Sequence, residues 1–255
     1  MSNETLPVLL TFDGSVAFIT LNRPEKRNAL NDAVVRSVKS ALRESSAKEA
    51  VRVVVITGAG QDFCSGADLE ALKKISDASV SENVDDARSL MELFELVRQV
   101  PVPVVAAVKG RALAGGCGLA SACDLIVAAD SARFGYPEVK IGFVPAMVLS
   151  ILKRNVSEKR AFELLTRGAE ISAEEAKEIG LVNQIFDIES FDNDLKVYLS
   201  AFEKLSKSAV ALTKTLLYQT DGMSFSAALE TGVDVNVIAR MTEDCRNGIA
   251  RFTKK

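Results

Sequence analysis

Two glycine-containing segments of this sequence could present free backbone amides to a ligand. The segments FCSGADL (63–69) and RALAGGCGLASACDL (111–125) each read as a strand, a tight turn and the start of a helix. The first amides of a helix have no acceptor within the helix and carry partial positive charge. Two such turns that face each other would therefore hold a substrate carbonyl oxygen as it gains negative charge. Each segment alone is also compatible with an ordinary turn.

Glu138 is the candidate acid/base. It follows Pro137 in the segment FGYPEVKIGFVPA (134–146), where most neighbours are apolar. Burial among apolar side chains raises a carboxyl pKa toward the range that suits general acid/base catalysis. The alternative is that Glu138 is only a polar residue in the first turn of a helix.

The composition removes several other kinds of chemistry. The 255 residues include no histidine, which excludes Ser-His-Asp and Cys-His nucleophilic sites and any histidine-ligated metal. The segment ITGAGQDF (56–63) has Phe63 where a dinucleotide-binding turn needs its third glycine, and no P-loop pattern occurs. Acid/base work therefore falls to Glu, Asp, Lys, Tyr or Cys.

Charge and cysteine content indicate the setting of the protein. Lys and Arg number 31 against 34 Asp and Glu, a net charge of −3, which gives no electrostatic reason to expect nucleic acid as a partner. The four cysteines form no CxxC pair and are interpreted as thiols in a reducing compartment. The N-terminal segment has no basic stretch, and no apolar run is long enough to span a bilayer. We therefore expect a cytoplasmic protein with no membrane partner.

Strand and helix patterns alternate along the first part of the chain. The β-rich runs 8–12 and 15–21 flank Asp13-Gly14 and predict a hairpin, and Asn31 is a good N-cap for the helix that follows. A continuous apolar strand comes next, over 51–58. After a weakly apolar stretch the pattern continues with a helix near 84–99, a strand over 102–108, a glycine-rich turn over 114–118, a short helix and a strand over 124–129. This order predicts an α/β fold.

Amphipathic helices predominate beyond residue 145. They are expected near 145–154, 158–166, 172–178, 191–206, 208–219, 224–239 and 242–251, with a strand over 181–186. The last helices carry apolar stripes at Leu212, Leu216, Leu217, Val233, Val237 and Ile238. Such stripes exceed what one small helical layer can bury, so part of them is expected to pack on another subunit; the alternative is an intrachain core.

Three segments, in this order and spacing, resemble the crotonase superfamily of enoyl-CoA hydratases and isomerases. They are LNRPEKRNAL (21–30), AVKGRALAGGCGLASACDLIVAADSARFGYPEVKIGFVPA (107–146) and EDCRNGIARFTKK (243–255). The resemblance implies a crotonase-like spiral of ββα units over residues 1–195, which carries a CoA-thioester site. It also implies a C-terminal helical trimerisation region over 196–255, and therefore a homotrimer or a dimer of trimers.

The resemblance also assigns roles to individual residues. The backbone N–H groups of Ala67 and Gly115 match the family's oxyanion hole, and Glu138 matches a catalytic carboxylate. The substrate is then an acyl-CoA thioester, whose oxygen gains charge as an enolate forms. Positions beside the two amides are expected to contact the substrate: Gly66, Leu69, Gly116 and Gly118.

Several other residues have two interpretations. Lys26, with Arg27, Lys254 and Lys255, could meet the phosphates of CoA or be solvated surface cations. Ala29 matches a family position near the CoA moiety. Phe143, like Met147 and Leu72, could line the acyl pocket or belong to the core. Asp68 could contact the substrate or act catalytically, although capping a helix start explains it better. The stretch 69–90 is expected to set acyl-chain length.

Gly118 is the main departure from the family pattern. Two-carboxylate hydratases of the family carry a Glu at this position, so only Glu138 matches here. Hydration must move a water proton and an α-carbon proton, whereas double-bond isomerisation needs only one base. We therefore expect hydration of 2-enoyl-CoA or isomerisation, by proton transfer that uses neither metal nor redox cofactor. The alternative is a non-catalytic CoA-thioester binding or assembly protein.

Overall fold

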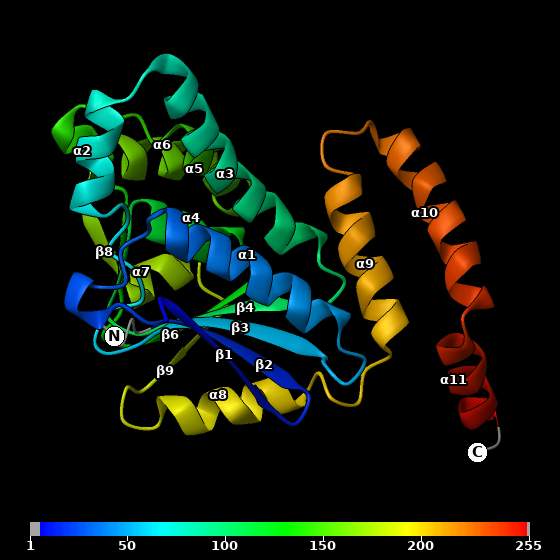
Figure 1. Cartoon of the computed structure of the whole chain (residues 1–255). Helices are drawn as coiled ribbons and strands as arrows, with labels where there is room; N and C mark the ends of the chain where they lie inside the picture. The colour runs from blue at the N-terminus through cyan, green and yellow to red at the C-terminus, as the bar shows by residue number, and fades with distance from the viewer. Residues whose placement is uncertain (1–5, 254–255) are drawn as a thin grey trace.

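Strands and helices alternate over most of the chain, and helices alone make up its last part (Figure 1). The computed structural model describes residues 6–253. The strands are β1 (Val8–Asp13), β2 (Val16–Leu21), β3 (Val53–Gly58), β4 (Val104–Val108), β5 (Arg111–Leu113), β6 (Leu125–Ala129), β7 (Arg133–Gly135), β8 (Glu170–Ser172) and β9 (Gln184–Phe186). The α-helices are α1 (Asp32–Ala47), α2 (Leu69–Asp77), α3 (Val80–Gln99), α4 (Gly115–Ala122), α5 (Ala146–Asn155), α6 (Glu158–Arg167), α7 (Ala173–Glu178), α8 (Phe191–Ser200), α9 (Lys207–Gln219), α10 (Phe225–Met241) and α11 (Glu243–Thr253). Two short 3-10 helices are η1 (Pro24–Lys26) and η2 (Pro137–Ile141).

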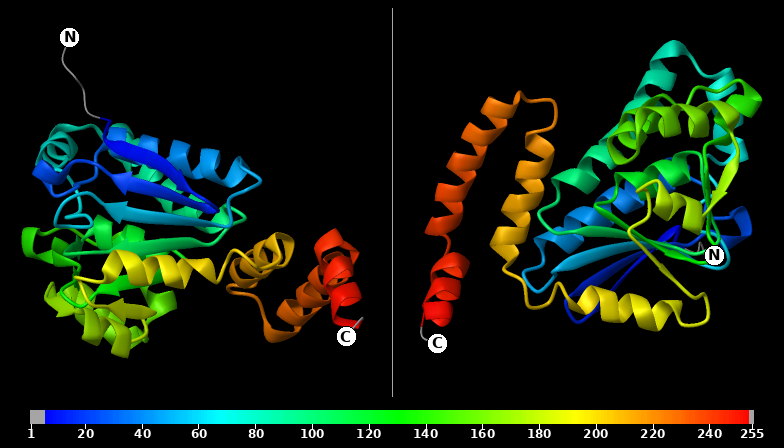
Figure 2. Two further views of the ribbon diagram at one scale, coloured as in Figure 1. Left: turned by 90° about the horizontal axis from the view of Figure 1, so that it is seen from below. Right: turned by 180° about the vertical axis from the view of Figure 1, so that it is seen from behind.

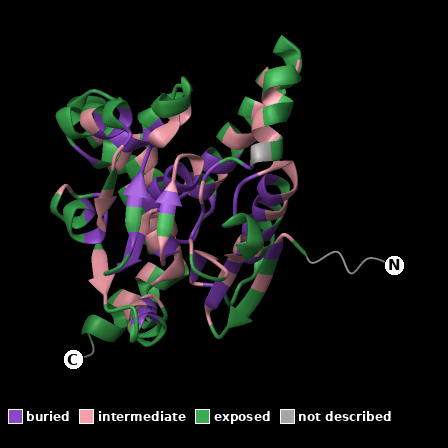
Figure 3. Ribbon diagram, turned by 90° about the vertical axis from the view of Figure 1, so that its left-hand side faces the viewer, coloured by how far each residue is buried: buried purple, intermediate pink, exposed green. Residues whose placement is uncertain are grey.

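The larger sheet has the strand order β1-β2-β3-β4-β6-β9. Only β1 and β2 are antiparallel, joined by the predicted hairpin, and the other neighbours are parallel. Helices α1, α3 and α4 cover one face, and α8 covers the other. Buried on both faces, the central strands consist of the continuous apolar runs that the sequence shows. Figure 3 shows buried residues, in purple, in the interior of the molecule and exposed residues, in green, on the outer helices.

A smaller sheet has the order β5-β7-β8, with β5 and β7 parallel and β8 antiparallel to β7. It holds the segments that precede Gly115 and Glu138, because β5 ends at Leu113 and β7 ends at Gly135. The helical positions of the sequence prediction agree closely with α5, α6 and α7. The α/β prediction is therefore confirmed.

Two helix starts lie earlier than the sequence reading placed them. Helix α3 begins at Val80 rather than near residue 84, because Ser79 and Glu82 form a capping box that satisfies its first amides. Helix α4 begins at Gly115, so most of the predicted glycine-rich turn is helical. Glycine is a poor helix former, but here it permits close packing, since a Cβ on Gly116 would lie 2.4 Å from the Cys64 carbonyl oxygen.

The C-terminal helices α9, α10 and α11 extend away from the sheet (Figure 2). The predicted boundary after residue 195 falls inside α8, whose Phe191, Leu195 and Leu199 are buried against the larger sheet. Within residues 6–253, no helix combines the length and the apolar character needed to cross a membrane.

Candidate active site

The three segments that the sequence singled out lie side by side. Single parallel bridges join Leu30 to Ala67 and Cys64 to Ala112, and Leu113 pairs with Gly135 in the small sheet. These segments run in one direction, so their carboxyl ends meet at one edge. Ala67 is itself paired with Leu30, and Gly115 and Glu138 lie within three residues of the paired Leu113 and Gly135. The structure thus brings together the three groups that were assigned to catalysis.

The amide of Ala67 points away from the segment that holds it. Groups on both sides of the Ala67 N–H face Leu30: the Leu30 N–H donates to Gly66 O at 2.7 Å, and the Asp68 N–H donates to Leu30 O at 2.9 Å. Because the C=O and the N–H of a trans peptide point in opposite directions, the Ala67 N–H, which shares its peptide with Gly66 O, faces away from Leu30. Among the described residues it donates to no protein acceptor. It is therefore free for a ligand.

Gly66 lies against the start of α4. Its φ of +97° is one that L side chains rarely adopt, and an added Cβ would lie 2.7 Å from the Ala114 Cβ and 3.6 Å from Gly115 N. Ala114, the residue before the helix, has φ 49° and ψ −127°, an unusual conformation for a residue with a Cβ. Its N–H donates to Gly135 O at 2.8 Å. This close backbone approach places the Gly115 amide, an unpaired first amide of α4, beside the Gly66–Ala67 peptide.

Glu138 follows Pro137 at the start of η2 and is half-buried. Its Oε2 is buried and has no hydrogen-bond partner within the described chain. Burial raises the pKa of the carboxyl above its ordinary value of 4.5. Tyr136, two positions earlier in the chain, is fully buried, and its hydroxyl lies 2.9 Å from Ser121 Oγ. A carboxyl held this way is suited to exchange a proton with a ligand.

Gly118 has no room for a side chain. An added Cβ would lie 2.3 Å from Val148 Cγ1 and 3.3 Å from Phe94 Cζ. Helices α5 and α3 have therefore filled the space beside α4. The predicted contact of Gly118 with substrate is not supported, because the residue is buried under these two side chains.

The cysteines of the site are not nucleophiles. Burial raises the pKa of Cys64 to about 12 and that of Cys117 to about 11. Both therefore remain neutral thiols, since the thiolate is the reactive form. Within residues 6–253, no group of three or more metal-ligating side chains is gathered.

The remaining predicted contacts fall into different settings. The Asp68 carboxylate caps α2 by accepting from Glu70 N at 2.9 Å and pairs with Arg23 at 2.6 Å, in agreement with the capping interpretation. Lys26 is exposed and pairs with Glu70 at 3.3 Å. Ala29 is buried beside Arg23. Leu69 is the first residue of α2, and Lys254 and Lys255 lie outside the described residues.

The apolar surface beside Glu138 is uncovered in the single chain. Phe143 is 45% exposed, and Val144 and Ile141 are more exposed still. Phe143 is thus on the surface rather than in the core. A cavity of about 430 Å³ lies elsewhere, between the core and the C-terminal helices, and none of the predicted site residues lines it.

Comparisons with known proteins identify the family of the chain. The family model described as enoyl-CoA hydratase/isomerase matches residues 11–255. The chain belongs to this family. It is 43% identical to a candidate enoyl-CoA hydratase of Thermus thermophilus over 95% of this chain and 96% of the relative. It is 32% identical to the 2,3-dehydroadipyl-CoA hydratase of Escherichia coli over 94% and 92%.

Solved structures of the enoyl-CoA hydratase/isomerase family have the same fold. An enoyl-CoA hydratase of Mycobacterium smegmatis superposes with a TM-score of 0.93 at 30% identity, over 98% of this chain and 97% of that one. The human enoyl-CoA hydratase domain-containing protein 3 gives 0.91 at 28% identity, over 97% of each. The predicted crotonase-like fold is confirmed, and the chain is an enoyl-CoA hydratase/isomerase family enzyme.

One residue with contacts beside the site was given no role from the sequence. Arg23 lies in the segment LNRPEKRNAL but was not assigned a role, although it pairs with the buried Asp68. Its partner is 45 positions away, and no periodic pattern links the two. An arginine next to a proline carries no local sign of such a contact.

Proposed function

We propose that this enzyme hydrates 2-enoyl-CoA thioesters to 3-hydroxyacyl-CoA with one carboxylate. The Ala67 and Gly115 N–H groups hold the thioester oxygen, and Glu138 moves the proton. The observation that carries the proposal is the buried, unpartnered Oε2 of Glu138 at the edge where the two free amides lie. A buried carboxyl oxygen without a hydrogen-bond partner lowers the stability of the fold. A protein that only binds CoA thioesters would have no use for such an oxygen beside the two amides.

The proposed steps use the protein groups as follows. Ionised Glu138 takes a proton from a water whose oxygen bonds to C3, and the C2=C3 electrons move toward the thioester oxygen. The enolate oxygen accepts hydrogen bonds from the two amides, which strengthen as its charge grows. Protonated Glu138 then donates the proton to C2. The sum is addition of one water across the double bond, with Glu138 returned to its ionised form.

Isomerisation is the second candidate, and Gly118 favours it. The Val148 and Phe94 side chains leave no space for a second carboxylate to hold a water. Glu138 would instead take a proton from C2 of a 3-enoyl-CoA and return it to C4, which moves the double bond from C3=C4 to C2=C3. We favour hydration because relatives that align with nearly the whole chain have hydratase names.

Coenzyme A enters the proposal as part of the substrate. Proton transfer through Glu138 requires neither a metal nor a redox cofactor. Lys26 is an exposed cation near the start of α2 and is proposed to meet the CoA phosphates, exchanging its Glu70 partner for them. We propose fatty-acid metabolism as the setting, since acyl-CoA thioesters are its substrates.

We also propose a homotrimer or a dimer of trimers in the cytoplasm. Apolar side chains of α10 are exposed although they repeat along one helix: Leu229, Val233, Val237 and Ile238. An apolar stripe of this kind is typical of a subunit interface. Cys64, Cys117 and Cys123 are free buried thiols, which suits a reducing compartment.

The function is tested with 2-trans-enoyl-CoA and 3-enoyl-CoA esters of several chain lengths. Hydration yields 3-hydroxyacyl-CoA, and isomerisation yields only a shifted double bond. The Glu138→Gln variant should lose about 10²–10⁴ in kcat, the range for a general acid/base. The exposed Glu158 of α6 provides a matched control, and Glu158→Gln should keep full activity. Binding of CoA esters without turnover by the wild type would instead favour the non-catalytic protein.

A further inference from the structure

The loop that precedes α1 is held in a conformation that needs support. Arg27 and Asn28 have φ values of 50° and 55°, in the left-handed region that non-glycine residues seldom adopt. Asn28 fixes the loop from inside: its Oδ1 accepts from Arg23 N, and its Nδ2 donates to Ala59 O and Asp62 O. The loop is therefore clamped to the segment that leads to Ala67.

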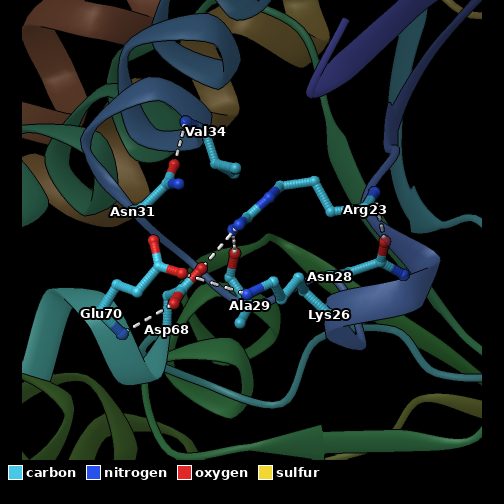
Figure 4. Close-up of polar contacts among 8 residues, drawn as sticks. All are labelled: Arg23, Lys26, Asn28, Ala29, Asn31, Val34, Asp68 and Glu70. Atoms are coloured by element: carbon cyan, nitrogen blue, oxygen red, sulfur yellow. Dashed lines mark hydrogen bonds and ion pairs between the residues drawn. The ribbon is translucent and has the colours of Figure 1, made fainter. Parts of the chain in front are cut away.

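The Arg23 guanidinium joins this loop to α2 (Figure 4). Its Nη1 donates to Ala29 O at 2.8 Å, and its Nη2 donates to Asp68 Oδ2 at 2.6 Å. The pair is shielded from solvent, with side-chain exposures of 15% and 2%. Burial alone would raise the pKa of Asp68, but the Glu70 amide and Arg23 together lower it. Asp68 is therefore ionised and fixes the guanidinium.

Two peptide groups connect Arg23 to the Ala67 amide. Arg23 donates to the Ala29 carbonyl, and the N–H of that same peptide, on Leu30, donates to Gly66 O at 2.7 Å. The Gly66 carbonyl shares its peptide with the Ala67 N–H. Each peptide that accepts a hydrogen bond becomes a better donor, and a cation at the start of such a chain adds to this polarisation.

We propose that Arg23, fixed by Asp68, is a positioning residue that orients and polarises the Ala67 amide through the Ala29–Leu30 and Gly66–Ala67 peptides. This inference rests on the proposed function, because it takes Ala67 as a donor to the thioester oxygen. The oxygen carries more charge in the transition state than in the bound substrate. Loss of Arg23 therefore lowers kcat more than it raises KM.

The first test compares Arg23→Met, Arg23→Lys and Arg23→Met/Asp68→Asn. Arg23→Met should lower kcat by about 10- to 100-fold, less than the 10²–10³ for loss of a whole oxyanion donor, with little change in KM. Arg23→Lys keeps a cationic donor and should recover part of the rate. Arg160→Met is the matched control, since Arg160 also forms an arginine–carboxylate pair, with Glu163 at 2.9 Å, but at an exposed position of α6. It should leave kcat unchanged.

The double variant separates polarisation from simple stability. Arg23→Met leaves a buried carboxylate without its cation and should lower the melting temperature. Adding Asp68→Asn removes that charge yet keeps an oxygen to cap α2, so thermal stability should return. The rate should not return with it. Recovery of kcat together with stability would overturn the proposal.

A second readout does not depend on turnover. Butyryl-CoA labelled with ¹³C at the thioester carbonyl cannot be hydrated, and its carbonyl resonance reports polarisation when bound. The bound resonance should move downfield in the wild type, less in Arg23→Lys and least in Arg23→Met. A wild-type shift that Arg23→Met leaves intact would overturn this inference alone. If the wild type binds the ester with no shift, the proposed oxyanion hole itself fails.

Discussion

The Glu138 site and the C-terminal helices differ in how fully the chain packs them. Around Ala67 and Gly115, backbone segments approach so closely that three of the local glycines could not accept a Cβ without a clash: Gly66, Gly116 and Gly118. Along α10 no residue is buried, and its apolar side chains face outward. The chain therefore builds its candidate oxyanion site from its own backbone, whereas α10 has an apolar face that its own core does not cover.

One polar cluster joins the C-terminal helices to the core. Lys214 of α9 donates to Val97 O at 2.8 Å and Val102 O at 3.0 Å, and it pairs with Asp124 at 2.7 Å. The Tyr218 hydroxyl donates to the same carboxylate at 2.7 Å. The helix is thus fixed to the core by hydrogen bonds to specific carbonyls, which define its position more narrowly than apolar contact would.

The largest effect on the packed region is expected from Gly66→Ala. The new Cβ meets Ala114 and Leu113 in a backbone conformation that favours glycine, so the Ala67 amide must move. We expect kcat to fall about 10²–10³-fold, as for loss of an oxyanion donor. Gly14→Ala is the control, because Gly14 also has a positive φ but nothing within 4 Å of its added Cβ. Equal kcat values for both variants would show that close packing at Gly66 is unimportant.

Lys214→Met tests the polar cluster that fixes α9 to the core. It leaves Asp124 buried without its cation, so the free energy of unfolding should fall by about 3–5 kcal/mol, measured by urea denaturation. Adding Asp124→Asn should restore part of the loss. The control is Lys159→Met at an exposed position of α6, which should change the free energy of unfolding by less than about 0.5 kcal/mol. An unchanged unfolding free energy in Lys214→Met would contradict the role given to this cluster.

Val233→Ser/Val237→Ser tests the open region. Both side chains are more than half exposed on α10. If this face packs on a second copy, polar replacement weakens association, and sedimentation velocity should show smaller species at micromolar concentration. Val80→Ser on α3 is a matched control, since Val80 is 83% exposed. Unchanged assembly in the α10 variant would place the interface elsewhere.

The smallest effect is a shift in the pH dependence. Burial raises the pKa of Glu138, and the ionised form is the base, so kcat/KM should rise with pH through a midpoint above 4.5. The stability contribution runs the other way: it is fully present below the unfolded pKa and is lost as pH rises through the folded one. Glu138→Gln should remove that loss in thermal melts. A kinetic midpoint at or below 4.5 would contradict the assigned environment.

Local patterns predicted most of the elements. The capping box at Ser79 and Glu82 was readable in the sequence and would have placed the start of α3 correctly. The packing of α8 could not be predicted from such a local pattern. The apolar spacing of Phe191, Leu195 and Leu199 indicates a helix, but it does not say that the helix packs under the larger sheet.

By itself, the sequence determined the residue types available for chemistry and the alternation of strands and helices. Without histidine, proton transfer had to fall to a group such as Glu138, and the glycines marked where backbone could approach backbone. Only the tertiary structure decided which amides stay free, that Gly118 has no space for a side chain, and that Arg23 reaches Ala29 and Asp68. The physical reason is that periodicity along a chain encodes which face is apolar, whereas hydrogen-bond pairing and close contact depend on segments that meet only after folding.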